Sequence, residues 1–193
     1  MGSGNSLKKK LMSKRGASIL LEMLLVTFLL TFMVFMPVAY FAYIQRSNVF
    51  QDVGNTTVQM MSLQGGVTTE VLERTRENLE YAGFDPDEVL YWSGSDFAGV
   101  LSKPIRYKGD LDGEGKPQLL RVLMIYPADR EASLLSNISK LVGPGSDKEA
   151  DSTGRTFYKY VGGSLVPVTV NQGFEGGWYY KAGGYTTSER KRP

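Results

Sequence analysis

The sequence predicts an α+β protein, in which a long N-terminal transmembrane helix precedes a small extracellular domain with a mainly antiparallel sheet packed on one or two helices. Three observations predict this class. Residues 17–44 form an almost unbroken apolar run, residues 45–82 carry apolar residues at helical spacing, and residues 104–171 contain strand-like segments separated by turn residues. This order indicates one α+β domain after the membrane helix.

The apolar run from Ala17 to Ile44 reads ASILLEMLLVTFLLTFMVFMPVAYFAYI and contains 28 residues. As a helix it would be about 42 Å long, whereas the hydrocarbon core of a bilayer is about 30 Å thick. A cleaved secretory signal fits poorly, because the apolar part of such a signal is about 7–15 residues long. The only charge in the run is Glu22, and an ionisable group at membrane depth is a candidate functional residue.

The flanks of the run set its expected orientation. Five basic residues and no acid precede it: Lys8, Lys9, Lys10, Lys14 and Arg15. After the run, Arg46 and Asp52 nearly balance each other. The positive-inside rule therefore places the N-terminus in the cytoplasm and everything after Gln45 outside the cell membrane. We expect residues 1–16 to be a basic cytoplasmic leader without regular structure.

Two helical segments follow the run. Residues 45–64 are expected to extend the membrane helix or to form a stalk, with a bend at Gly54, because glycine weakens a helix interior. Residues 68–82 predict a second helix with a threonine cap at Thr68 or Thr69, and Gly83 follows its last apolar residue as a C-terminal cap. The next segment, residues 84–92, predicts a short helical turn or a loop, because Asp85 stands before a proline.

The remaining chain predicts two strand pairs around a third helix. Residues 104–108 and 118–127 predict a hairpin whose second strand is buried. Residues 129–142 predict an amphipathic helix, against which a sheet of about four strands would pack together with the base of the long helix.

Two glycines, Gly162 and Gly163, predict a second hairpin between residues 155–161 and 164–170. Pro167 places the later strand at a sheet edge. The extracellular domain is expected to span residues 65–171, and residues 172–193, which are rich in glycine and aromatic residues, are expected to form a loosely ordered tail.

Composition narrows the possible chemistry. The chain has 193 residues and a net charge of +2, and it contains no cysteine and no histidine. The lack of cysteine argues against a disulfide-stapled scaffold, and the lack of histidine excludes Ser-His-Asp and Cys-His sites. The part after the basic leader is close to neutral, so we expect no nucleic-acid partner. We expect neither enzymatic activity nor a cofactor.

Acidic residues alternate at Asp110, Asp112 and Glu114, as they do in a calcium loop. The twelfth position of an EF-hand loop that starts at Asp110 would be Arg121, where calcium needs a bidentate glutamate. A hairpin turn is the better interpretation, and no metal site is expected.

The N-terminal junction carries a family resemblance. It runs Lys14-Arg15-Gly16, then ASILLE, then a long apolar helix. This resembles the class III signal of type IV pilins and pseudopilins, and especially of the TadE-like minor pseudopilins of tight-adherence secretion systems. The resemblance implies a prepilin peptidase site at Lys14, Arg15, Gly16 and Ala17. It also implies that Glu22 pairs with the freed N-terminal amine of a neighbouring subunit. A carboxylate in lipid is costly unless it is paired or protonated, which supports that role.

One departure from the pattern concerns the position of the glutamate. If cleavage follows Gly16, Glu22 is the sixth residue, whereas the family has glutamate at the fifth. Cleavage after Ala17 would restore the fifth position and leave Ser18 as the new terminus; alternatively, the chain is not cleaved.

The function that the resemblance implies is that of a membrane-anchored minor subunit of a type IV, tight-adherence-like pilus or secretion machine. Its partners would be the membrane, other pilin-like subunits that contact the apolar helix, a prepilin peptidase and an inner platform protein. The alternative is a single-pass anchor that displays an extracellular binding module without filament assembly.

Overall fold

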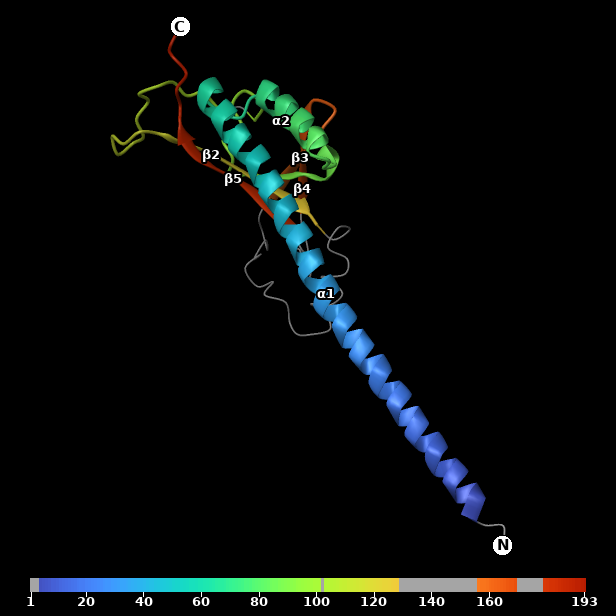
Figure 1. Ribbon diagram of the computed structural model, residues 1–193. Coiled ribbons are helices and arrows are strands. Elements are labelled where there is room, and N and C mark those ends of the chain that lie inside the picture. The colour runs from blue at the N-terminus through green and yellow to red at the C-terminus, as the bar shows by residue number, and fades with distance from the viewer. Residues whose placement is uncertain (1–3, 102, 129–155, 170–178) are drawn as a thin grey trace. The chain divides into compact units, whose positions relative to one another are not determined.

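The computed structural model describes residues 4–101, 103–128, 156–169 and 179–193, and within them the side chains from residue 18 on, except that of residue 169. The chain divides into two compact units, residues 1–42 and 43–193. The helices and strands, in order, are α1 (Gly4–Gln64), α2 (Thr69–Tyr81), the 3₁₀ turn η1 (Pro86–Glu88), β1 (Leu90–Trp92), β2 (Leu119–Pro127), β3 (Thr156–Val161), β4 (Ser164–Thr169) and β5 (Tyr179–Thr187) (Figure 1). The α+β class is confirmed, and the helix predicted over residues 129–142 lies outside the described residues.

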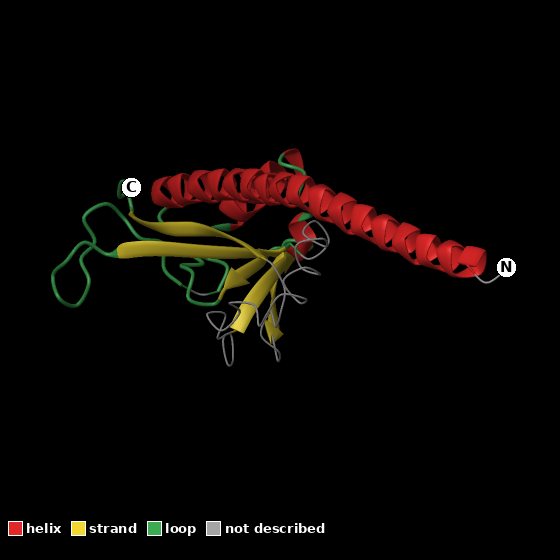
Figure 2. Cartoon of the chain, turned by 60° about the horizontal axis from the view of Figure 1, so that its bottom comes forward, coloured by secondary structure: helices red, strands yellow, loops and turns green. Residues whose placement is uncertain are grey.

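Five strands form one antiparallel sheet in the order β4-β3-β1-β2-β5 (Figure 2). Its longest pairing joins β2 to β5, from Leu119 opposite Thr187 to Pro127 opposite Tyr179. The prediction of a loosely ordered tail is therefore wrong for residues 179–187, which form an integral strand. The physical reason is burial, because Tyr180 and Ala182 of this strand lie in the core.

The first predicted hairpin is only partly correct. Strand β2 and the turn before it are confirmed, but residues 104–108 are not a strand. Their backbone bonds other segments instead: the Arg106 N–H donates to the Gly65 carbonyl at 2.8 Å, and the Lys108 N–H donates to the Arg190 carbonyl at 2.7 Å. The second partner of β2 is the short strand β1, which follows the predicted turn at residues 86–88.

The second predicted hairpin is confirmed. Gly162 and Gly163 have φ values of 57° and 82°, which are the left-handed conformations that a two-residue type I′ turn needs. Strand β4 lies at the edge of the sheet, as Pro167 predicts, since proline cannot donate to a further ladder.

Helix α2 forms an antiparallel hairpin with the end of α1. Three hydrogen bonds show that the two helices run in opposite directions. Gln64 at the end of α1 bonds Glu70 at the start of α2, at 3.1 Å. Further back along α1, Thr57 bonds Thr75 at 3.0 Å and Arg46 bonds the Gly83 carbonyl, just after α2, at 2.8 Å. Both predicted caps are confirmed. The Thr68 side chain accepts from the Val71 N–H, and Gly83, with a φ of 79°, closes a Schellman motif.

The last part of α1, from Tyr43, runs beside β5 and belongs to the core of the C-terminal unit. The Tyr43 hydroxyl donates to the Tyr179 carbonyl at 3.1 Å, and the Ser62 hydroxyl donates to the Thr187 carbonyl at 2.7 Å. The rise of α1 between these bonds is about 28 Å, which matches the rise of about 27 Å along β5. Residues 45–64 therefore extend the helix, which was one of the two expected forms, and α1 is continuous through Gly54, where a bend was expected.

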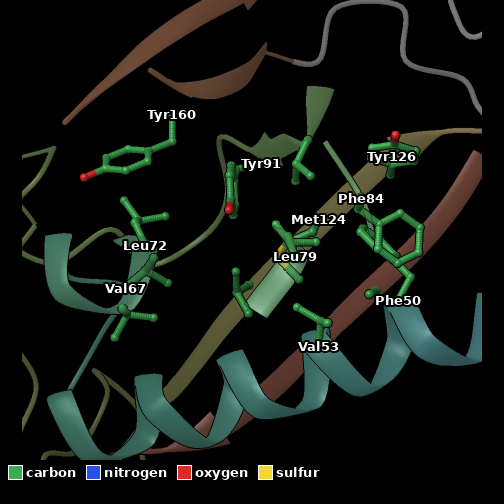
Figure 3. Packing of buried hydrophobic residues seen from close by; sticks show 14 of the residues in the cluster. Phe50, Val53, Val67, Leu72, Leu79, Phe84, Tyr91, Met124, Tyr126 and Tyr160 are labelled. Atoms are coloured by element: carbon green, nitrogen blue, oxygen red, sulfur yellow. The ribbon is translucent and has the colours of Figure 1, made fainter. Parts of the chain in front are cut away.

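The core lies between these two helices and one face of the sheet. Figure 3 shows Phe50 and Val53 pointing from α1 into the same cluster as Leu79 of α2 and Met124 of β2. Aromatic rings close the cluster near Phe84, whose ring centroid lies 5.2 Å from that of Phe50 and 5.1 Å from that of Tyr126. This packing fixes the orientation of the helix base against the sheet.

Candidate functional site

The candidate site is the apolar segment of α1 from residue 18 to residue 42. Almost all of its large apolar side chains are exposed, with exposed fractions from 38% at Met36 to 73% at Met33. A helix that exposes hydrocarbon on every side is typical of an element that is buried in lipid or among other helices. Within the described residues, α1 is the one helix that is long and apolar enough for a membrane span or a signal sequence.

The polar groups of this segment are mostly satisfied by the helix itself. Between residues 19 and 39 the polar side chains are Glu22, Thr27 and Thr31. The Thr27 hydroxyl donates to the Met23 carbonyl at 2.8 Å, and the Thr31 hydroxyl donates to the Thr27 carbonyl at 2.7 Å. Such bonds let a threonine enter lipid at little cost. For the Glu22 carboxylate, no hydrogen bond or ion pair is present within the described side chains, which begin at residue 18.

Glu22 lies on the surface of the helix, about 10 Å beyond Arg15 along the axis. None of the side chains described from residue 18 onward forms an ion pair with it. An ionised carboxylate that leaves water needs a cation or a proton, and a helix surface can receive that cation from an adjacent helix. The geometry therefore suits pairing between helices.

The predicted processing residues lie in the same helix. The backbone of Lys14, Arg15, Gly16 and Ala17 is helical, and α1 begins at Gly4. The expectation of a leader without regular structure is therefore wrong from Gly4 onward. The side chains of these four residues lie outside the described part of the chain. The structure thus places the candidate cleavage site and Glu22 on one continuous helix.

The C-terminal end of α1 is held by residues that no sequence pattern indicated. The Arg190 guanidinium donates to the Gln64 carbonyl at 2.9 Å, where a cation complements the negative end of the helix dipole. The Glu189 N–H donates to the Ser62 carbonyl at 2.9 Å. The basic ending ERKRP could have indicated a contact with an acidic or carbonyl group, but nothing in the sequence indicates that this group is the end of α1.

Two acidic residues that the sequence patterns singled out, Asp112 and Asp85, serve a turn and a cap. Asp112 accepts from the N–H groups of Glu114 and Lys116, both at 2.9 Å. Asp85 accepts from the Asp87 N–H at 3.0 Å and caps η1, as predicted. In the described part of the chain, no three histidine, cysteine, aspartate or glutamate residues gather in a way that could hold a metal ion.

The chain matches no protein-family model, no curated protein and no solved structure. The evidence for its class is therefore the architecture itself. A long apolar N-terminal helix, whose last part packs against an antiparallel sheet, is a pilin-like architecture.

Proposed function

We propose that this chain is a membrane-anchored subunit of a type IV pilus-like machine, similar to the TadE-like minor pseudopilins of tight-adherence systems. In this proposal residues 17–44 cross the cell membrane, the N-terminus is cytoplasmic and the unit of residues 43–193 is extracellular. The observation that carries the proposal is Glu22, the one carboxylate in residues 17–44, a segment of α1 whose large apolar side chains are almost all exposed.

A neighbouring subunit would satisfy this carboxylate. An ionised acid in hydrocarbon costs about 3 kcal/mol even by the lowest scales. Cleavage after Gly16 or Ala17 creates a new ammonium within about 8 Å of the depth of Glu22. If that ammonium lies on an adjacent helix, the ion pair removes the cost and fixes the axial register of the two helices.

The test combines processing with assembly. The chain is expressed with a prepilin peptidase and the other components of a tight-adherence system, and the membrane-extracted protein is analysed by mass spectrometry. We expect a terminus at Ala17 or Ser18. Glu22→Ala is expected to reduce incorporation into filaments at least about tenfold, because the subunit loses its ion pair.

Thr27→Ala is the matched control, because Thr27 is also polar and exposed on the apolar segment but bonds its own helix. It is expected to assemble normally. An intact Met1 terminus together with normal assembly of Glu22→Ala would reject the pairing mechanism.

A chimera separates this proposal from the alternative of an anchored binding module. Residues 17–44 are replaced by an apolar helix of the same length without an acid. An anchored module keeps its surface display and its function, whereas a filament subunit loses assembly while its membrane insertion is unchanged.

A further inference from the structure

The two faces of the sheet differ in composition. The last part of α1 and helix α2 lie on one face (Figure 2), toward which buried side chains such as Leu120 and Val122 point. Because side chains alternate along a strand, the residues between them point to the opposite face, which we call the outer face. The charged residues of the five strands are Arg121, Lys159 and Lys181. Each stands between two residues that belong to the core or pack against it. The charges of the strands are therefore all basic and all on the outer face.

The exposed part of the outer face lies along β2 and β5. Near Phe157 of β3 the outer face is buried. Along β2 and β5, by contrast, the exposed fraction is 58% for Leu119 and 76% for Tyr185. Arg121 and Lys181 are exposed as well. No described helix covers this part of the sheet, so a partner can reach it.

Rings and a cation alternate across this exposed part. The strand register places Tyr185 of β5 directly opposite Arg121 of β2, and side chains in directly opposite positions on one face contact each other. The Arg121 guanidinium carbon lies 5.6 Å from the centroid of the Trp92 ring, where the face of the ring attracts the cation. Tyr185, Arg121 and Trp92 therefore form a row that crosses β5, β2 and β1.

The cations of the exposed part lack a carboxylate partner among the described side chains. No ion pair there joins Arg121 or Lys181 to an acid. The Asp96 carboxylate accepts from the Arg121 backbone N–H at 2.8 Å, and it pairs with Lys103 at 3.8 Å. Charge complementarity therefore favours an anionic ligand, and a guanidinium can bind a carboxylate through two parallel hydrogen bonds.

Gly183 keeps the surface open between Lys181 and Tyr185. It has a φ of 126°, and a Cβ at this position would overlap the Val122 carbonyl oxygen. A side chain therefore does not fit there. Lys181 and Tyr185 lie about 13 Å apart along the strand. An open strip of this length suits an extended chain better than a small molecule, which needs a concave site.

We propose that the exposed part of the outer face binds an acidic polysaccharide. Sugar rings would pack on Tyr185 and Trp92, because aromatic rings offer flat apolar surface. Carboxylates of the polymer would bind Arg121 and Lys181. The inference goes beyond the proposed function, but it rests on it in one respect: the proposed function places this unit outside the cell membrane, where polysaccharides are the available anionic chains.

A single-stranded nucleic acid is the less favourable ligand. Its bases would also stack on aromatic rings, but it carries a phosphate at every nucleotide. The sequence after residue 42 contains 17 basic and 19 acidic residues, a net charge of −2. A unit of this charge repels a densely charged polymer. A polysaccharide with one carboxylate for every two rings needs only the local cations of the outer face.

The experiment measures binding of the full chain to hyaluronan, whose repeat has two sugar rings and one carboxylate. The chain is held in octaethylene glycol dodecyl ether, because a sugar detergent would compete, and biotinylated hyaluronan is fixed on a sensor. We expect saturable binding that weakens as salt is added. Carboxyl-reduced hyaluronan keeps the rings and loses the charge, so we expect it to bind at least about tenfold more weakly.

Two variants test the row of rings and cation. Tyr185→Ala and Arg121→Gln are each expected to lower the affinity at least about fivefold, because a stacking ring or a cation is lost. Tyr185→Phe keeps the ring and is expected to retain the wild-type affinity. Urea unfolding checks that the variants fold, and Lys181→Gln takes the place of a test variant that does not.

The matched controls lie on α2, which packs on the other face. Tyr81 has an exposed fraction of 93%, and Arg74 is exposed on the same helix. Tyr81→Ala and Arg74→Gln are expected to bind hyaluronan like the wild type.

The inference is overturned if hyaluronan does not bind, if the carboxyl-reduced polymer binds equally well, or if the test variants that fold bind like the wild type. Tighter binding of a thymidine oligonucleotide would overturn it as well. None of these outcomes touches the proposed function, which Glu22→Ala tests through assembly. Hyaluronan binding together with normal assembly of Glu22→Ala would keep the sheet surface and reject the pairing of helices.

Discussion

At Gly54, helix α1 lies against the backbone of strand β5 with no room for a side chain. A Cβ at this position would lie 2.6 Å from the Cβ of Ala182 and 2.8 Å from the backbone nitrogen of Gly183. The strand opposite is built of small residues, because Gly183 and Gly184 follow Ala182. Glycine at this point therefore serves close backbone approach between helix and strand.

Gly54→Ala is expected to destabilise the protein by about 1–3 kcal/mol, because the added methyl group forces the two backbones apart. Intrinsic helix propensity acts in the opposite direction, since alanine favours a helix interior by about 1 kcal/mol over glycine. Urea unfolding of the detergent-solubilised chain measures the difference. Ala182→Gly in the same chain is expected to restore part of the loss, and an alanine variant more stable than the wild type would contradict this account of Gly54.

Asp110 joins the loop after residue 106 to the end of the chain. Its carboxylate accepts from the Tyr107 N–H at 2.8 Å and from the Arg192 guanidinium at 2.7 Å. The Tyr107 hydrogen bond first, and then the Arg192 bond, lower the pKa of Asp110 below its ordinary value of 3.8. The charged form is thus the one that the folded state favours.

The stability that Asp110 contributes is therefore present above pH 3.8 and is lost as the pH falls through the lowered folded-state pKa. Asp110→Asn is expected to be less stable than the wild type at neutral pH. The difference is expected to shrink toward zero in strong acid, where the wild-type carboxyl is protonated as well. Parallel unfolding curves between pH 7 and pH 2 measure it; a difference that does not change with pH would show that the charge has no part in the contact.

At the scale of elements, short sequence patterns correctly predicted the features that depend on neighbouring residues, namely helix caps and tight turns. Thr68 and Gly83 bracket α2 correctly because capping depends on residues within one turn of the helix. Gly162 and Gly163 fix the β3–β4 hairpin because only a few residues accept both left-handed positions.

Elements that depend on distant partners were not predictable in the same way. Strand β1 has three residues, too few to show a period, and it is held by β2 and β3 on either side. Strand β5 contains Gly183 and Gly184, which are unfavourable in a strand unless another backbone lies close, as α1 does here. Residues 104–108 alternate like a strand, but their backbone partners lie at Gly65 and Arg190.

The candidate site follows the same rule. The sequence identifies the apolar run and Glu22 because composition alone makes a lone acid in hydrocarbon conspicuous. The residues that hold the helix base, such as Ser62 and Arg190, act through partners more than 120 positions away in the chain (125 for Ser62 and 126 for Arg190). No local pattern reveals such partners.

At the scale of the whole molecule, the exposed apolar segment predicts how the chain behaves in cells. The full chain is expected to stay in the membrane pellet after an alkaline carbonate wash and to leave it only with detergent, because about 28 apolar residues cannot enter water. Immunoblotting of pellet and supernatant measures this. A variant without residues 1–42 keeps the compact unit of residues 43–193 and is expected in the supernatant. Release of the full chain by carbonate would exclude a membrane span.

The pairing of α1 with β5 also governs the order of events during synthesis. The inner face of the helix, with Phe50, Val53 and Met61, leaves the ribosome first, and the strand that covers it begins 117 positions after Ser62, at Tyr179. At about 5–20 residues per second, roughly 6 to 23 s pass between the two. During that interval the nascent chain has helix α1 but not its last strand, so the apolar inner face of the helix stays open to chaperones, proteases and other unfinished chains.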